Sequence, residues 1–128
     1  EKYHNLIINI HENFIKAGAD VILTNTFTTR KVRLKENKVL NKFKYVNEKA
    51  CELALKAIEN INKNTILAGC LPAQNNTYVK DERDKEIIES NFYDQAKLIA
   101  PYVNFFYLDV LSSSRELEIS MNICEKLK

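Results

Sequence analysis

Three short apolar runs divide the chain. They cover residues 21–27, 65–71 and 104–111, are rich in β-branched or aromatic side chains, and are bounded by turn-forming residues. Runs of this length and composition are typical of buried β-strands. They recur roughly every 40 residues with helical patterns between them, which is the rhythm of βαβ units. Such units build a parallel sheet with helices packed against it.

The remaining segments predict helices. Apolar side chains recur at intervals of three and four residues in four stretches, residues 6–17, 50–61, 87–99 and 117–124. Gly18 is placed to end the first helix and Pro101 the third, whereas an Asn/Lys-rich turn ends the second. Ser113 and Glu116 have the spacing of a capping box at the start of the fourth helix.

The resulting order is helix, strand, helix, strand, helix, strand, helix. Three parallel strands in this order leave two unpaired sheet edges, which proteins normally cover or close. A complete (β/α)₈ barrel has about 250 residues, whereas this chain has 128. We therefore expect an α/β fold that is an incomplete parallel TIM-type barrel, running from about helix 1 to helix 4 with three strands present.

A ligand is expected at the carboxyl ends of these strands, because the loops of parallel α/β folds converge there. Asp109 lies near the end of the third run. Burying a carboxylate at that position is costly unless it is paired or meets the cation of a ligand, so Asp109 is a candidate binding residue. The other interpretation is that Asp109 caps the helix that follows.

The ends of the other two runs are also polar. Thr24, Asn25 and Thr26 predict a polar pocket wall, since Asn is disfavoured in strands, although Asn25 could equally bond a neighbouring loop. Cys70 has no histidine near it in sequence to activate it, so a small wall residue is favoured over a nucleophile. His11, on the first helix, is interpreted as structural, and so is His4.

Composition narrows the class of function. The formal net charge of +2 argues against nucleic-acid binding, and no run approaches the ~18 apolar residues of a membrane helix. Cys51, Cys70 and Cys124 are odd in number and widely spaced, which predicts a reducing, cytoplasmic compartment. The basic segment, residues 30–44, is interpreted as a solvated loop and helix start rather than an anion-binding patch.

Residues 11–27 read HENFIKAGADVILTNTF. This stretch resembles the signature of the homocysteine S-methyltransferase family, H-x-x-[YF]-I-x-A-G-A-D-V-I-x-T-N-T-[FY]. Asn47 with Ala50, the AGCLP stretch at residues 68–72, and Asp109 with its following Ser and Glu resemble later parts of the family's domain in the same order. Residues 1–128 are therefore expected to be a partial homocysteine-binding barrel domain that lacks the first strand and the C-terminal half.

The resemblance implies an S-methyltransferase that, as the intact protein, transfers a methyl group to the thiol of homocysteine and forms methionine. In this family, zinc held by three cysteines binds the substrate sulfur and keeps it deprotonated. Asp109 matches an acidic residue, usually Glu, that holds the substrate's ammonium group. Thr24, Asn25 and Thr26 match the family's pocket wall. The methyl donor, a betaine, an S-methyl sulfonium compound or a methylated folate, stays open.

The family's zinc cysteines come from later Gly-Gly-Cys and Cys-Cys segments, and neither occurs in this chain. No catalytic or metal-binding residue is therefore assigned here, and the Zn²⁺ ligands are expected outside this chain. The expected partners are homocysteine and a methyl donor, without nucleic acid or membrane. The alternative is a non-catalytic α/β binding or assembly module. A Schiff-base aldolase would need a lysine at a strand end, and none of the three runs carries one.

Overall fold

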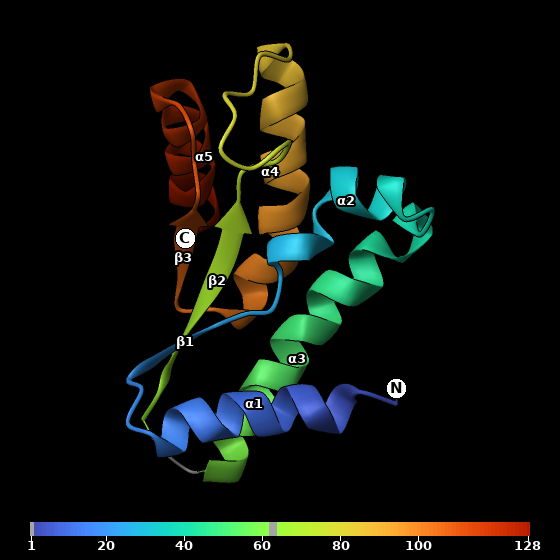
Figure 1. Cartoon of the computed structure of the whole chain (residues 1–128). Coiled ribbons are helices and arrows are strands. Elements are labelled where there is room, and N and C mark those ends of the chain that lie inside the picture. Colours follow the sequence, from blue (N-terminus) through green and yellow to red (C-terminus); the bar gives the residue numbers. More distant parts are fainter. Residues whose placement is uncertain (1, 62–63) are drawn as a thin grey trace.

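The structure, a computed structural model, describes residues 2–61 and 64–128 (Figure 1). Three parallel strands, β1 (Val21–Leu23), β2 (Ile66–Pro72) and β3 (Phe105–Asp109), form one open sheet in the order β1-β2-β3. The helices are α1 (His4–Lys16), α2 (Lys31–Glu36), α3 (Phe43–Ile61), α4 (Lys85–Ile99) and α5 (Ser114–Leu127). The predicted alternation of helices and strands is confirmed, with α2 and three 3₁₀ turns, η1 (Phe27–Thr29), η2 (Leu40–Lys42) and η3 (Ala100–Tyr102), added between them.

Local chemistry sets the helix ends. Gly18 has φ +109°, its N–H donates to Ile15 O at 3.0 Å, and the next N–H donates to Phe14 O at 3.1 Å. This is a Schellman ending, which needs a residue without Cβ at the left-handed position. At the start of α5, Ser113 is the N-cap and accepts from Glu116 N at 3.3 Å, as its spacing predicts. The turn expected after α3 includes residues 62 and 63, which lie outside the described residues.

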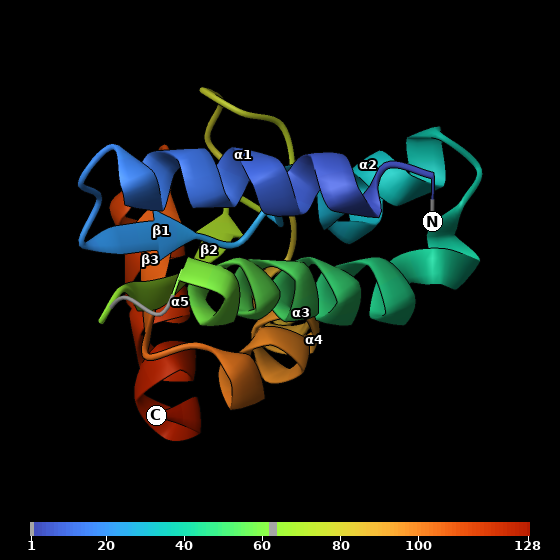
Figure 2. The same ribbon diagram turned by 90° about the horizontal axis from the view of Figure 1, so that it is seen from below.

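The helices cover one face of the sheet. Ile22 of β1 and Leu67 of β2 are buried against Ile15 of α1 and Ala54 of α3, two helices that lie side by side in Figure 2. Farther along the sheet, a second cluster buries apolar side chains of β2, α4 and α5, namely Leu71, Ile88, Phe92, Ala96, Ile119 and Ile123. These two clusters supply the apolar burial that holds the helices on the sheet.

No helix of the described residues covers the opposite face of the sheet, here called the open face. Side chains alternate along a strand, so the neighbours of the buried Ile22 and Leu67 and of the partly buried Phe106 point to this face. Five of these neighbours are large and solvent-exposed, namely Val21, Leu23, Ile66, Phe105 and Tyr107, whereas Ala68 is buried. An apolar sheet face of this kind is what a barrel encloses when further strands close it.

Two strands are shorter than the apolar runs predict. The first run extends to residue 27, but β1 ends at Leu23 because Thr26 N donates to Thr24 O at 2.9 Å and turns the chain into η1. The third run extends to residue 111, but β3 ends at Asp109 because Val110 adopts a left-handed φ of +54°. β1 therefore ends just before the predicted polar residues that begin at Thr24, and β3 ends on Asp109. No helix of the described residues is long and apolar enough to cross a membrane.

Candidate functional site

The candidate site lies at the carboxyl edge of the sheet. The parallel register pairs Leu23 with Ala68 and Pro72 with Asp109, so the three strands end near one another. The segment after β1, the end of β2 and the end of β3 thus contribute to one edge. This is the edge at which parallel α/β folds bind ligands.

Thr24 and Thr26 fasten the end of β1 to β2. Thr24 Oγ1 accepts from the Cys70 N–H at 2.9 Å, and Thr26 Oγ1 donates to the Cys70 carbonyl at 2.6 Å. The two hydroxyls also share a hydrogen bond of 2.8 Å, and both residues are buried. Their hydroxyls are therefore used by the protein itself, and any contribution they make to a pocket wall is through position rather than through free polar groups.

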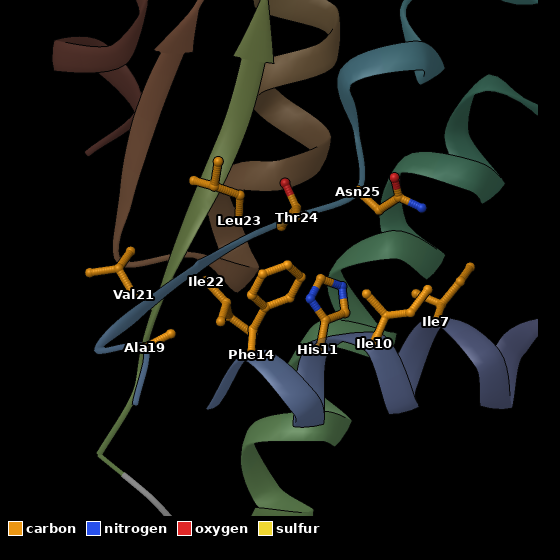
Figure 3. A pocket seen from close by; sticks show the side chains of 10 residues that line it. All are labelled: Ile7, Ile10, His11, Phe14, Ala19, Val21, Ile22, Leu23, Thr24 and Asn25. Carbon is orange, nitrogen blue, oxygen red and sulfur yellow. The ribbon is translucent and has the colours of Figure 1, made fainter. Parts of the chain in front are cut away.

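Asn25 differs from the two threonines in that its side chain is exposed. With Thr24 it lines a cavity of about 430 Å³ between α1 and β1 (Figure 3). Most of the wall is apolar, including Ile10 and Phe14, and His11 also points into it. Burial lowers the pKa of His11, so its imidazole is neutral at pH 7. Within the described residues its Nε2 has no hydrogen-bond partner.

Asp109 and Cys70 meet on the open face. The Cys70 thiol donates to Asp109 Oδ2 at 3.5 Å, while the Asp109 side chain keeps partial contact with solvent. Burial first and the neighbouring Asp109 carboxylate second raise the pKa of Cys70 to about 12. The thiol is therefore protonated at neutral pH and is a donor rather than a nucleophile. This agrees with the interpretation of Cys70 as a wall residue.

A buried amide network beneath the site was not predicted from the sequence. Gln95 Nε2 donates to Thr26 O at 3.0 Å and to Asn47 Oδ1 at 3.0 Å, and Gln95 Oε1 accepts from Gln74 Nε2 at 2.7 Å. Thr29 Oγ1 donates to Asn47 Oδ1 at 2.6 Å. The signal available in the sequence is that Gln95 lies three residues after Phe92, on the apolar face of α4.

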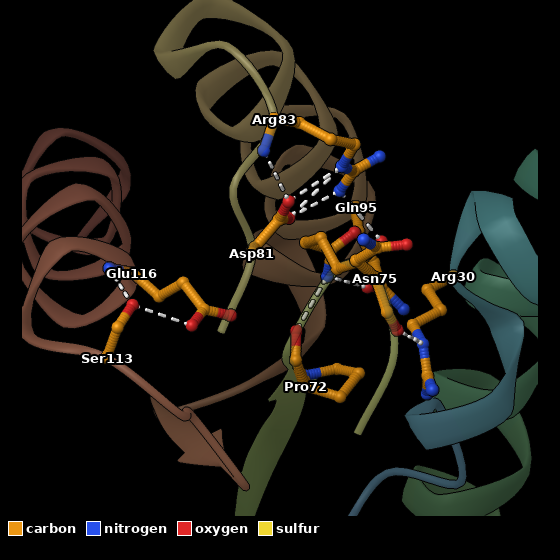
Figure 4. Close-up of polar contacts among 9 residues, drawn as sticks. Arg30, Pro72, Asn75, Asp81, Arg83, Gln95, Ser113 and Glu116 are labelled. Atoms are coloured by element: carbon orange, nitrogen blue, oxygen red, sulfur yellow. Dashed lines mark hydrogen bonds and ion pairs between the residues drawn. The ribbon is translucent and has the colours of Figure 1, made fainter. Parts of the chain in front are cut away.

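Arg30 is a second buried group that sequence reasoning placed wrongly. The segment of residues 30–44 was expected to be solvated, but the Arg30 side chain is fully buried. It donates to Phe27 O at 2.7 Å and to Asn75 O at 3.2 Å, which ties the segment after β1 to the loop after β2 (Figure 4). Burial lowers the pKa of Arg30. The expectation holds for Arg33, whose side chain is 43% exposed and pairs with Glu36 at 2.9 Å.

The loop after β2 is held by a second arginine. Arg83 forms a two-pronged pair with Asp81, whose carboxylate is buried (Figure 4). Burial alone would raise the pKa of Asp81, but the hydrogen bonds from Arg83 outweigh it and the pKa is lowered. Arg83 also donates to Gln74 O at 3.3 Å. The loop is thus fixed beside the carboxyl edge at both of its ends.

The described residues do not fit a zinc ion. Cys51 lies on α3, Cys70 on β2 and Cys124 on α5, and burial raises the pKa of these thiols to about 12, about 12 and about 11. Cysteine binds zinc as a thiolate, and three cysteines on separate elements do not form a grouped set of ligands. Among the described residues no three His, Cys, Asp or Glu side chains are grouped to hold a metal.

The sequence and the fold of this chain both resemble those of known proteins. The family model "Homocysteine S-methyltransferase" matches residues 2–128. The solved structure of the homocysteine methyltransferase MmuM from Escherichia coli in its metallated form is 16% identical, with a TM-score of 0.79 over 95% of this chain and 48% of that chain. The oxidized form of MmuM gives 15% identity and a TM-score of 0.80, over 96% of this chain and 47% of that one. The search of curated proteins finds no match.

These likenesses confirm the predicted fold class. The chain spans about half the length of the solved structures it matches, and its three parallel strands correspond to about half of that barrel. The identity of 15–16% carries the fold alone, whereas the family model covers nearly every residue. The chain belongs to the homocysteine S-methyltransferase family and contains a partial barrel domain of that family.

Proposed function

We propose that this chain forms the amino-acid-binding part of a methyltransferase that transfers a methyl group to the thiol of homocysteine and releases methionine. The observation that carries the proposal is Asp109, a carboxylate at the carboxyl end of β3 that is accessible on the open face and is bonded, among the described residues, only by a thiol. An ammonium group is the natural counter-ion for such a carboxylate. Family membership supports homocysteine as the compound that carries it.

The other predicted site residues support the position of Asp109 or line the surface near it. Thr24 and Thr26 hold the end of β1 against β2, and so fix the wall beside Asp109. Asn25, at the end of that segment, is exposed to a ligand or to a neighbouring strand. Zn²⁺ would be held by residues outside the described ones, since the thiols here do not fit it. The proposal assigns no step of the reaction to the three cysteines.

The test uses the polypeptide expressed from its complete coding sequence. Methionine formation from homocysteine is followed by mass spectrometry with a betaine, an S-methyl sulfonium compound and a methylated folate as donors. We expect one donor to support turnover and Asp109→Asn to raise KM for homocysteine by about 10-fold or more, since a bond between charged groups is lost. Glu59→Gln, on the exposed face of α3, is the matched control and should leave KM unchanged.

The second candidate is a non-catalytic α/β binding module. The observation that favours it is the lack of a metal-binding group among the described residues. In that case homocysteine binds to the complete polypeptide and Asp109→Asn weakens the binding, but no donor yields methionine. Absence of both binding and turnover would contradict both candidates.

A further inference from the structure

The pair formed by Cys70 and Asp109 has a geometry that a wall residue alone does not explain. Along β2, Leu71 packs into the helix-side core, and a Cβ added at Gly69 would meet Ile99 and Val103 on that side. Because side chains alternate along a strand, Cys70 points to the open face instead. Its thiol there lies 3.5 Å from Asp109 Oδ2. Cys70 is nevertheless only 3% exposed, so it sits beneath the carboxylate and not beside it in solvent.

The backbone of Cys70 is fixed on both sides. Its N–H donates to Thr24 Oγ1 at 2.9 Å, and its carbonyl accepts from Thr26 Oγ1 at 2.6 Å. Residues on either side of it pair in the ladder, Ala68 with Phe105 and Pro72 with Asp109. The thiol is therefore carried by a backbone position that is bonded on both sides, and its distance from Asp109 is set by the strand register.

One oxygen of the Asp109 carboxylate is thereby distinguished from the other. Among the described residues, Cys70 is the one donor to this carboxylate, and it binds Oδ2. The raised pKa keeps the thiol protonated, so it donates throughout the neutral range. Oδ1 is left for a group that arrives from the open face. A carboxylate held by one donor loses less rotational freedom when it binds its ligand.

We propose that Cys70 is a positioning residue for Asp109: its thiol holds Oδ2 so that Oδ1 faces the ammonium group of an α-amino acid. This inference rests on the proposed function, because it takes the ligand of Asp109 to be the ammonium group of homocysteine. It assigns to Cys70 a part in selecting amino acids over thiols that lack the amine. It predicts that a hydroxyl, which also donates, can replace the thiol.

The test compares homocysteine with 4-mercaptobutanoate, which keeps the thiol and carboxylate but lacks the amine. Dissociation constants are measured by calorimetry on the polypeptide from its complete coding sequence, in wild type, Cys70→Ala, Cys70→Ser and Asp109→Asn. Wild type should prefer homocysteine by about 10-fold or more. Cys70→Ala should reduce that preference by about 3- to 10-fold, without changing the affinity for 4-mercaptobutanoate, and Cys70→Ser should restore most of it.

The pattern of results across the variants separates the possible failures. If Asp109→Asn removes the preference while Cys70→Ala keeps it, the role of Cys70 is wrong and the proposed function stands. If wild type shows no preference, or if Asp109→Asn leaves it intact, the proposed function is wrong and this inference falls with it. Equal weakening of both ligands by Cys70→Ala would indicate damage to the fold and would also contradict a positioning role.

A spectroscopic measurement does not depend on the folding of an alanine variant. The S–H stretch of Cys70 is identified in the infrared difference spectrum by its loss in Cys70→Ser. Homocysteine should shift this band, because its ammonium group competes for the charge of the carboxylate that the thiol bonds. The amine-free analogue should not shift it. A band that responds to neither ligand would overturn the proposal.

Discussion

Gln95 of α4 donates to Asn47 Oδ1 of α3 across 3.0 Å, and both side chains are fully buried. The same Gln95 amide reaches Thr26 O, 69 residues earlier in the chain, at 3.0 Å. One polar side chain thus joins two helices to the segment that leaves β1. The side chains of this network are amides and hydroxyls, so they hold the carboxyl edge of the sheet without placing a charge there.

Replacing Gln95 with Leu should destabilise the chain strongly. The apolar side chain would leave Asn47 Oδ1 with one donor fewer and Gln74 Nε2 without its 2.7 Å acceptor on Gln95. Buried polar groups that lose partners cost about 1–3 kcal/mol each, so we expect a loss of about 2–4 kcal/mol. Urea unfolding measures it. Ser90→Ala, at an exposed position of the same helix, should change stability by less than about 0.5 kcal/mol. Equal stability of the two variants would show that the network contributes little.

Gly69→Ala tests the closeness of the sheet to α4. A Cβ at residue 69 would lie 2.7 Å from Ile99 Cγ2 and 3.1 Å from Val103 Cγ2. Overpacking of this kind costs about 1–3 kcal/mol. Gly18→Ala is the comparison, because there a Cβ meets no atom within 4 Å and the cost comes from the left-handed backbone alone. Repacking of Ile99 should be visible in the methyl NMR spectrum of Gly69→Ala and not of Gly18→Ala; identical spectra would contradict the contact.

The buried thiols predict how stability depends on pH. Burial raises the pKa of Cys51 and of Cys70 from 9.0 to about 12 in the folded chain. The folded state therefore holds these protons more tightly than the unfolded state. Their contribution is complete below pH 9 and is lost as pH rises from about 9 to 12, by up to about 1.4 kcal/mol per pH unit for each thiol.

Alkylation by iodoacetamide checks the premise of this prediction, that the thiols of Cys51 and Cys70 are buried and protonated in the folded chain. At pH 8 the folded chain should react slowly at Cys51 and Cys70, whereas urea-unfolded chain should react at all three cysteines. Peptide mass spectrometry assigns the sites. Rapid modification of Cys70 in the folded chain at pH 8 would contradict a protonated, buried thiol and would also weaken its proposed role beside Asp109.

Residues 1–128 expressed alone are expected to bind no stoichiometric zinc and to form no methionine. The reason is that Cys51, Cys70 and Cys124 lie on separate elements, and no three His, Cys, Asp or Glu side chains of the described residues are grouped to hold a metal. Metal content after dialysis measures it. A content of one zinc per chain, lost in Cys70→Ser, would contradict this expectation. We also expect self-association, since the open face exposes Leu23, Phe105 and Tyr107.

The sequence predicted those features that are determined by neighbouring residues. Gly18 ends α1 and Ser113 starts α5 because the backbone bonds involved span at most five residues. The three apolar runs located the strands, because strand residues that are buried against the helices are apolar and make each run stand out in composition. Asp109 stood out for a similar reason, as a charge on an apolar strand.

The features that the sequence did not predict depend on contacts between distant segments. Arg30 looks like other basic residues of its segment, and one of the two carbonyls that accept from its buried side chain comes from the loop after β2, 45 residues later. The attachment of the segment after β1 to β2 depends on Thr24 and Thr26 bonding the backbone of Cys70, more than 40 residues away. The Asp109–Cys70 contact likewise requires the strand register, which hydrophobic periodicity does not specify.

The measurement that tests the central claim most directly is the affinity of homocysteine for the complete polypeptide in wild type and in Asp109→Asn. The two side chains have nearly the same size, so the change removes the charge and leaves the shape of the pocket. Calorimetry should show homocysteine binding in wild type and a loss of about 10-fold or more in Asp109→Asn, while Glu59→Gln binds as wild type does. Equal affinity in wild type and Asp109→Asn would contradict the placement of the substrate's ammonium group at this edge of the sheet.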